Sequence, residues 1–279
     1  MTRLFPLLAL LVALSACTSR AASPTHAHTS TAGCDETERW DDGRVRLCEE
    51  RVVTLAPRDL RLDATTNGGV RVAAWDRDEI EIRATVSAVA PSDAEAERLL
   101  QQVRLRTDGT VRAETPEIRP GHDAWVAVEY DVRVPRRTDL DLTALNGGIQ
   151  VEGVSGDVEA QTVNGALGLD GVDGRVRART VNGSVAVNVA RWSGDGMDVS
   201  TTNGSITMDL PPSLSATVDA RTSVGPIRID GLPLSDEGCT SRGGASVGCV
   251  GGRVRGDLGS GGPTLRASTT HGAIRLRRR

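Results

Sequence analysis

Hydrophobic and polar residues alternate over two short segments on either side of a recurring Asn-Gly pair. The pair, or a substitute for it, begins at seven positions: Asn67, Asn146, Asn164, Asn182, Asn203, Val224 and His271. The four steps from the second of these positions to the sixth are 18, 18, 21 and 21 residues. In these later copies, the positions six and four residues before the Asn and three and five after it are apolar. This period-2 pattern predicts two short strands in each copy, both with one buried face.

A period of about 20 residues is typical of stacked repeats. Residue class is also matched column by column. A Thr stands two residues before the Asn position in five copies: Thr162, Thr180, Thr201, Thr222 and Thr269. Parallel, in-register stacking favours such matching, so we predict an all-β solenoid in which each copy of 18–21 residues forms one coil. A meander of β-hairpins is the alternative, because Asn-Gly between alternating strands is a strong hairpin signal.

The Asn column indicates turn chemistry rather than ligand binding. Asn and Gly both tolerate a positive φ, so we expect a sharp corner with left-handed residues at each pair. Stacked copies would align the side chains of this turn column in a ladder. Its members are Asn67, Asn146, Asn164, Asn182, Asn203 and His271.

The first 17 residues predict export. An apolar run from Leu4 to Leu14 is too short to span a bilayer, and it ends in Leu-Ser-Ala-Cys17, which resembles a bacterial lipobox. This resemblance implies that Cys17 carries the lipid that anchors the protein to a membrane of the cell envelope, the outer membrane or the cell surface. Residues 18–33 are small and polar, and we interpret them as a flexible tether in which His26 and His28 bind no metal.

Four cysteines remain after the lipidated Cys17, and an even number in an exported chain predicts disulfides. Among the three possible connectivities we expect local pairing, Cys34 with Cys48 and Cys239 with Cys249. A zinc site built from all four cysteines is the rival interpretation, but the chain has no Cys-x-x-Cys spacing.

Residues 34–139 do not repeat cleanly. Residues 60–72 resemble one copy with a bulge in the upstream strand, and residues 79–86 and 125–134 alternate as strands. A capping box at Ser92 and Glu95 predicts a helix. We interpret this part as a strand-helix-strand cap on the repeats of residues 140–279, which are interrupted by a disulfide-bearing insertion at 232–262.

Charge adds little to the functional picture. The net charge is −4, every one of the 33 basic residues is Arg, and charges of both signs alternate along the outward columns. This pattern is typical of a solvated surface and does not predict nucleic-acid binding. The basic C-terminus, Arg275–Arg279, reads as a guard on the exposed edge of the last copy, with contact to an anionic lipid or polymer as the alternative.

The chain from about residue 50 onward resembles the bacterial "putative adhesin" family of β-strand-repeat domains. The resemblance is carried by segments that include Thr65–Val70, Leu145–Ile149, Thr180–Val185, Thr201–Ile206 and Ser268–Ile274. It implies a right-handed, single-stranded β-helix on a lipoprotein, and it brings no catalytic residues and no cofactor.

We therefore expect a non-enzymatic surface protein that binds an envelope protein or glycan or acts as a scaffold. One outward column offers a flat binding face: Thr143, Gln161, Arg179, Ser200, Arg221 and Ser268. The alternative is a polysaccharide-active enzyme, whose paired carboxylates would come from Asp170, Asp173, Asp195 and Asp198. The same aspartates also suit turns, or calcium-stabilised stacking, although the calcium-binding nonapeptide motif is absent from the sequence.

Overall fold

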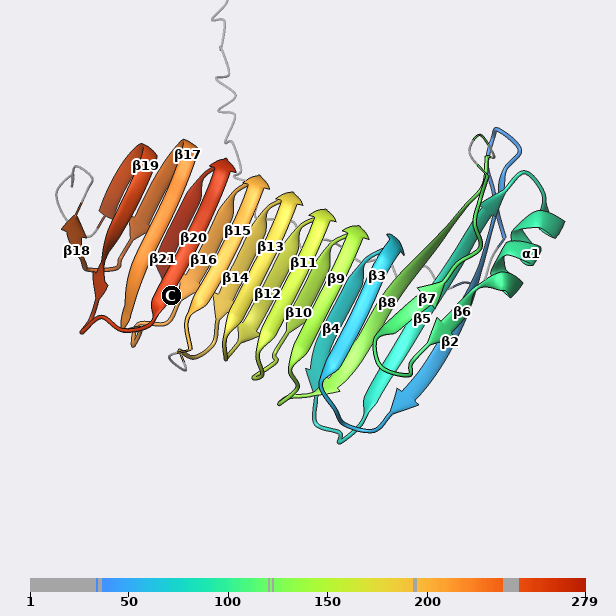
Figure 1. The fold of residues 1–279 in the computed structure, drawn as a ribbon, viewed down its shortest axis with the longest axis horizontal. Coiled ribbons are helices and arrows are strands. Elements are labelled where there is room, and N and C mark those ends of the chain that lie inside the picture. Colours follow the sequence, from blue (N-terminus) through green and yellow to red (C-terminus); the bar gives the residue numbers. More distant parts are fainter. Residues whose placement is uncertain (1–33, 35–36, 120, 122, 193–194, 238–245) are drawn as a thin grey trace, which may run out of the picture. The chain divides into compact units, whose positions relative to one another are not determined.

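The computed structural model describes residues 34, 37–119, 121, 123–192, 195–237 and 246–279. They form 21 strands in one sheet and a single α-helix, so the all-β prediction is confirmed for this part of the chain (Figure 1). Cys17, His26, His28 and the proposed tether lie outside the described residues. In the described part, no helix has the length and apolar character that crossing a membrane requires.

Successive copies pair through two parallel ladders. The first ladder contains the strand before each Asn: β9 (Leu140–Asn146), β11 (Val158–Asn164), β13 (Val176–Asn182) and β15 (Met197–Asn203). The second contains the strand after it: β10 (Ile149–Glu152), β12 (Leu167–Val172), β14 (Val185–Val189) and β16 (Ile206–Leu210). Each strand pairs in parallel with its counterpart in the next copy, and Asn146, Asn164 and Asn182 are register partners. A hairpin meander would instead need antiparallel pairs, so that alternative is wrong for these copies.

The copies do not stack in sequence order. The last copy, β20 (Thr264–His271) and β21 (Ile274–Arg278), pairs with β15 and β16 on one side and with β17 (Ala216–Asp230) on the other (Figure 1). It therefore lies between the copy of Asn203 and the copy of Val224. The interpretation of Arg275–Arg279 as an edge guard is wrong, because both C-terminal strands have partners on both sides.

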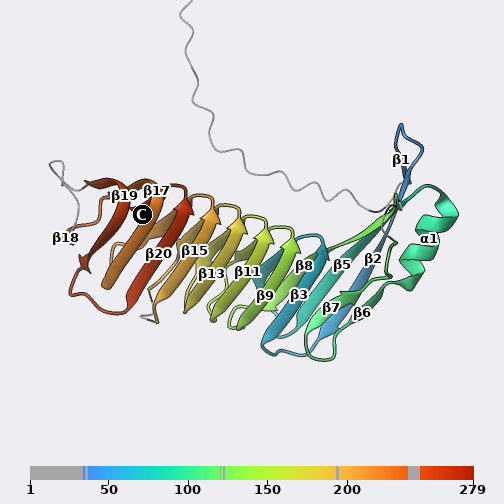
Figure 2. The ribbon, with the colours of Figure 1, turned by 45° about the horizontal axis from the view of Figure 1, so that its top comes forward.

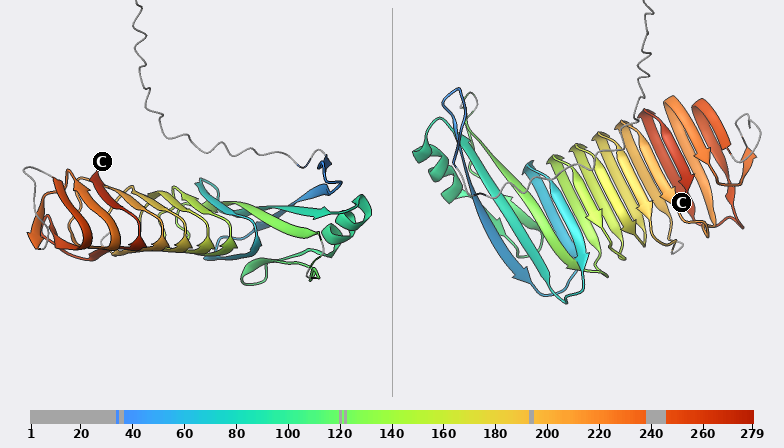
Figure 3. Two further views of the ribbon diagram at one scale, coloured as in Figure 1. Left: turned by 90° about the horizontal axis from the view of Figure 1, so that it is seen from above. Right: turned by 180° about the vertical axis from the view of Figure 1, so that it is seen from behind.

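The predicted insertion covers β17 instead. Strand β19 (Ser246–Leu258) runs antiparallel to β17 along its length, and β18 (Leu234–Glu237) pairs with the C-terminal end of β19. Figures 2 and 3 show these strands at the end of the stack away from the helix. This hairpin allows the chain to return and place its last copy inside the stack.

The amino-terminal part extends the ladders and then changes to antiparallel pairing. Strands β3 (Leu60–Asn67) and β4 (Val70–Trp75) pair in parallel with β9 and β10, and the predicted bulge lies between Ala64 and Asn67. Strand β4 also pairs in parallel with β8 (Trp125–Pro135). Strand β8 pairs antiparallel with β5 (Ile80–Ala90), and β5 pairs antiparallel with β2 (Val45–Leu55). Three short strands complete the region: β1 (Glu38–Arg39), β6 (Arg104–Arg106) and β7 (Val111–Glu114).

The predicted helix is α1 (Asp93–Gln102). The Ser92 side chain accepts a hydrogen bond from the Glu95 backbone N–H at 3.4 Å, as the capping box requires. The apolar residues of α1, Ala96, Leu99 and Leu100, are buried in the same hydrophobic core as the inward residues of the strands. The helix contacts β2 and β5 (Figure 2).

The four inward columns of the repeats are buried as their alternation predicts. Their largest fully buried side chains include Leu142, Ile149, Leu167, Leu169, Ile206, Met208 and Ile227. Burying one such side chain contributes about 1.5–3 kcal/mol. Because each copy supplies only a few of them, the copies depend on their neighbours for a continuous core.

The glycine column is required by close stacking and not by backbone handedness. A Cβ on Gly165 would lie 2.1 Å from the carbonyl oxygen of Gly147, and one on Gly183 would lie 2.0 Å from that of Gly165. None of these three glycines has a positive φ, and no described residue other than glycine has one. The expectation of left-handed residues at the Asn-Gly corner is therefore wrong for these copies.

The threonine side chains of the Thr column donate hydrogen bonds to the carbonyl groups of these corner glycines. Thr162 Oγ1 donates to the carbonyl of Gly147 at 2.8 Å, and Thr180 Oγ1 donates to that of Gly165 at 2.9 Å. The other three threonines of the column make the equivalent bond to a glycine of the adjacent copy. All five are buried, which explains why a hydroxyl recurs at an inward position.

We expect Thr180→Val to destabilise the protein by about 1–3 kcal/mol, because valine has the same shape but leaves the carbonyl of Gly165 without its hydroxyl donor. Urea unfolding followed by circular dichroism measures this loss. Thr207→Val on the outer surface of β16 is the matched control and is expected to change the free energy of unfolding by no more than about 0.5 kcal/mol. An equal effect of the two substitutions would contradict this role of Thr180.

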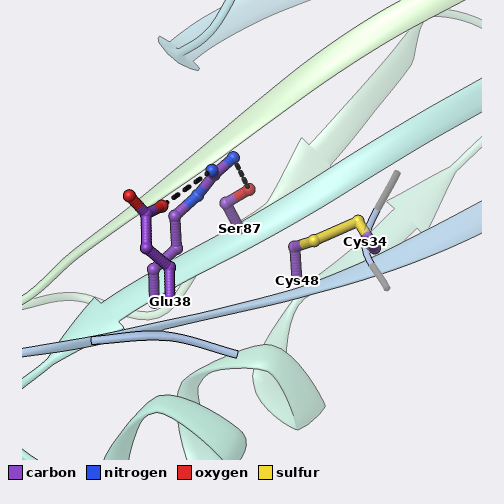
Figure 4. The surroundings of a disulfide bond; sticks show 5 residues. Cys34, Glu38, Cys48 and Ser87 are labelled. Atoms are coloured by element: carbon purple, nitrogen blue, oxygen red, sulfur yellow. Dashed lines mark hydrogen bonds and ion pairs between the residues drawn. A yellow bond between two sulfur atoms is a disulfide. The ribbon is translucent and has the colours of Figure 1, made fainter. Parts of the chain in front are cut away.

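Cys34 and Cys48 are joined by a disulfide, as local pairing predicts. Figure 4 shows the bond beside β2, where Arg46 donates to Glu38 at 3.4 Å and to Ser87 Oγ at 3.2 Å. Cys239 and the side chain of Cys249 lie outside the described residues, so their pairing stays a prediction.

Candidate functional site

The outward column predicted from the sequence forms one continuous row across six adjacent strands. We call it the outer row, and in spatial order it contains Thr143, Gln161, Arg179, Ser200, Ser268 and Arg221. Every neighbouring pair is in register, so the side chains repeat at the strand spacing of about 4.8 Å. Because the last copy lies inside the stack, Ser268 separates Ser200 from Arg221.

The middle of the outer row is held by surface ion pairs and hydrogen bonds. Arg179 donates to Asp198 at 3.0 Å, and Gln161 donates to Glu159 at 2.9 Å. Arg177 also contacts Glu159 at 3.3 Å. Such exposed pairs contribute little to stability, about 0–1 kcal/mol each. They are therefore available for exchange with a polar ligand.

A row of exposed apolar side chains lies beside the outer row and was not predicted. Leu145, Val163 and Val181 directly precede three of the ladder asparagines and are 42%, 37% and 41% exposed. In sequence they occupy the outward phase of the alternation, where a large apolar residue is unexpected. Together the two rows give the first ladder a surface with both polar and apolar groups.

The asparagines form a hydrogen-bonded ladder at the adjacent corner. The side-chain amides of four asparagines each donate to the side-chain Oδ1 of the asparagine in the preceding copy, at 2.9–3.0 Å; the donors are Asn146, Asn164, Asn182 and Asn203. His271 is the register partner of Asn203 and continues the column. The amide groups are used along the stack, which agrees with a structural role.

An arginine cluster lies at the end of the outer row. It comprises Arg221 of β17, Arg253 of β19 and Arg266 of β20, arranged around Asp219 with Ser268 beside them. Arg253 binds the Asp219 carboxylate with two hydrogen bonds, at 2.6 and 2.7 Å, and Arg266 approaches it at 3.9 Å. Hydrogen bonding from Arg253 holds the pKa of Asp219 below its usual range, against a smaller opposing effect of burial.

The repeat pattern identified Arg221 and Ser268 but missed the rest of this cluster. Arg253 lies in the insertion, whose pairing with β17 has no counterpart in the repeats. Arg266 belongs to the charged outward column and would be a neighbour of Asp219 in either order of the last two copies, but the exchanged order places it between Asp198 and Asp219. The alternation of β19 was the signal that could have placed Arg253.

Three hollows follow one another across the strands of the first ladder. The first is formed by the arginine cluster. The second shares Arg266 with it and is also lined by Arg175, Arg177, Asp195 and Asp198. The third shares Arg175 and Arg177 with the second and continues to Arg61 of β3. We call this series the cross-strand groove.

The four aspartates that the sequence suggested for catalysis or calcium binding do not form one cluster. Asp195 and Asp198 share the middle hollow, whereas Asp170 lies on the second ladder and accepts a hydrogen bond from Asn188 at 2.6 Å. Asp173 pairs with Arg191 at 3.7 Å. The described residues contain no group of three or more histidine, cysteine or acidic side chains that could hold a metal ion.

We expect Asp219 to stabilise the fold only while it is ionised. Its folded-state pKa is below the unfolded value of about 3.9, so the contribution is complete above that value and is lost as the pH falls through the folded pKa. Urea unfolding of the wild type and Asp219→Asn tests this. The difference in stability should be largest near pH 6 and should shrink below about pH 4. A difference that stays constant over this range would contradict it.

Comparisons with known proteins add structural likenesses. No protein-family model and no curated protein matches the sequence. A solved "putative cell adhesion protein" from Clostridium sporogenes is 11% identical, with a TM-score of 0.43 over 83% of this chain and 100% of its own.

Two further structures are each 9% identical with a TM-score of 0.30. A "putative adhesin" from Bacteroides fragilis covers 83% of this chain and 97% of its own, and a "putative lipid binding protein" from Parabacteroides distasonis covers 82% and 96%. At these values the likenesses carry no argument about function.

Proposed function

We propose that this protein is a non-enzymatic, adhesin-like lipoprotein of the bacterial cell envelope, anchored through Cys17. Its stacked copies are proposed to form a right-handed β-solenoid that presents the outer row to an envelope protein or glycan. The role is adhesion or scaffolding, with no cofactor and no nucleic-acid partner.

The observation that carries this proposal is the register of the outer row. Six side chains from six strands lie in one line, and Arg179 and Gln161 at its middle take part only in exposed, weak polar pairs. A rigid backbone ladder holds the row, so binding need not order a flexible loop, and the entropic cost of association is reduced. The exposed apolar row beside it adds contact area of the kind found in binding surfaces.

Capture of an envelope component tests the proposal. The full chain, with its disulfides intact, is immobilised and exposed to solubilised envelope from the native cell. We expect a specific protein or glycan to be retained, and we expect Arg179→Ser combined with Arg221→Ser to abolish retention.

The matched control is Arg228→Ser combined with Arg275→Ser, which removes the same charge from two exposed, register-paired residues of β17 and β21 in the second ladder. This control should retain the component at the wild-type level. No retention by the wild type over a range of salt concentrations would overturn the proposal, and equal loss in both double variants would show that the outer row is not the binding face.

A further inference from the structure

The arginine cluster concentrates positive charge around one carboxylate. Three guanidinium groups surround Asp219, and this carboxylate already accepts two hydrogen bonds from Arg253. Arg221 and Arg253 are direct register partners on β17 and β19. Like charges placed opposite each other across strands destabilise a sheet, so an additional anion at this point would be favourable.

The chemistry of the cluster selects the kind of anion. Each guanidinium group has five N–H donors in a planar fork that matches two oxygens of a carboxylate or a phosphate. Asp219 is only 9% exposed at its side chain, whereas Arg253 and Arg266 are 43% and 55% exposed. The buried carboxylate thus fixes two arginines from below while their outer surfaces remain accessible. Ser268 adds a hydroxyl group to the same hollow.

The cross-strand groove indicates that the ligand is extended. From the arginine cluster, the adjoining hollows cross β15, β13, β11 and β9 to β3, and neighbouring hollows share arginines. A linear polymer lying along this line would contact one strand after another at equal spacing. A small anion would occupy only the first hollow.

The charges along the groove exclude a densely charged polymer. The first hollow has three arginines and one aspartate, and the middle hollow has three arginines and two aspartates. The last has three arginines but five carboxylates. A nucleic acid, with a phosphate at every step, would be repelled at the β3 end. Sugar hydroxyl groups can both donate to carboxylates and accept from arginines, so a glycan with spaced acid groups suits the whole groove.

We propose that the cross-strand groove binds an acidic polysaccharide, with one of its carboxylates held by Arg221 and Arg266. The inference rests on the proposed function, because it names the ligand class of the same surface. Arg221 belongs to both the outer row and the arginine cluster, and Arg266 belongs to the groove alone.

Binding of the full chain to hyaluronan, which carries one carboxylate for every two sugars, tests this inference, with fully methyl-esterified hyaluronan as the matched ligand that lacks the charge. We expect the wild type to bind the acid form, and we expect the ester to bind at least about tenfold more weakly. Arg221→Ser combined with Arg266→Ser should weaken binding of the acid form by a similar factor. Arg228→Ser combined with Arg275→Ser should change it by less than about twofold.

Folding of the variants is checked by circular dichroism. If the double variant does not fold, Arg221→Ser alone is the test, because this side chain is exposed and acts on Asp219 through its charge. Its loss should still weaken binding several-fold. Equal binding of the acid and the ester would overturn the inference, as would equal losses in the two double variants. Tighter, equally arginine-dependent binding of single-stranded DNA would also overturn it.

The result separates the inference from the proposed function. If the wild type does not bind hyaluronan but still captures an envelope component through Arg179 and Arg221, the acidic-glycan inference fails and the binding surface stands. If neither hyaluronan nor any envelope component binds, both fail.

Discussion

A chain that ends at Pro263 is expected to lose its folded structure or most of its stability. The truncation removes β20 and β21, which lie inside the stack and pair with β15 and β16 on one side and β17 on the other. It deletes the buried side chains of Leu265, Ile274 and Leu276. Their burial contributes about 5–9 kcal/mol, and a whole domain is stable by only about 5–15 kcal/mol.

Thermal unfolding and limited proteolysis measure this effect. The matched control ends at Leu276 and loses only exposed arginines, so it should remain folded, with a smaller loss from the contact of Arg277 with Asp209. If the last copy were instead a terminal coil, the chain ending at Pro263 would lose one end unit and keep a melting temperature near that of the wild type. That outcome would contradict the observed order of the strands.

Gly165→Ala is expected to destabilise the protein by about 3 kcal/mol or more. The new Cβ would lie 2.1 Å from the carbonyl oxygen of Gly147, which belongs to the backbone of the adjacent copy and cannot move without breaking the ladder. Gly168→Ala in the following strand is the matched control. Its Cβ would lie 3.7 Å from a side-chain carbon of Gln150, which is an ordinary contact.

Chemical denaturation of both alanine variants distinguishes the two explanations of the glycine column. Gly168→Ala should leave stability unchanged or raise it slightly, since alanine restricts the unfolded chain. If Gly165→Ala were equally mild, the close stacking at the corner would not be the reason for the conserved Asn-Gly pattern within this chain.

The repeat could be predicted in detail because each copy satisfies the same local rules. Alternation placed the inward columns correctly, and the matched Thr and Asn columns indicated parallel register. The spatial order could not be predicted, because copies beginning near Val218 and Leu265 have equivalent columns and fit either neighbour. Which of these two copies lies at the end of the stack depends on β19, which lies in the insertion and covers the outer edge of β17.

The candidate site, like the fold, could be predicted only in its repeating part. The outer row follows from the alternation, since its residues occupy one outward phase of a regular pattern. The arginine cluster does not, because Arg253 reaches Asp219 across a hairpin that the repeats do not encode. The reason for the Asn-Gly pair was also misjudged: glycine is needed to admit a neighbouring carbonyl, and this contact is visible only after stacking.

The proposed surface depends most directly on the order in which the copies stack, and disulfide trapping measures that order. Adjacent strands hold their Cα atoms about 4.8 Å apart, within the disulfide range, and strands two apart exceed it. Ser200→Cys is combined either with Ser268→Cys or with Arg221→Cys, and cross-links formed by mild oxidation are mapped by mass spectrometry. The structure predicts a bond between positions 200 and 268 and none between 200 and 221. A bond between 200 and 221 instead would contradict the spatial order of the outer row and, with it, the arginine cluster and the continuity of the groove.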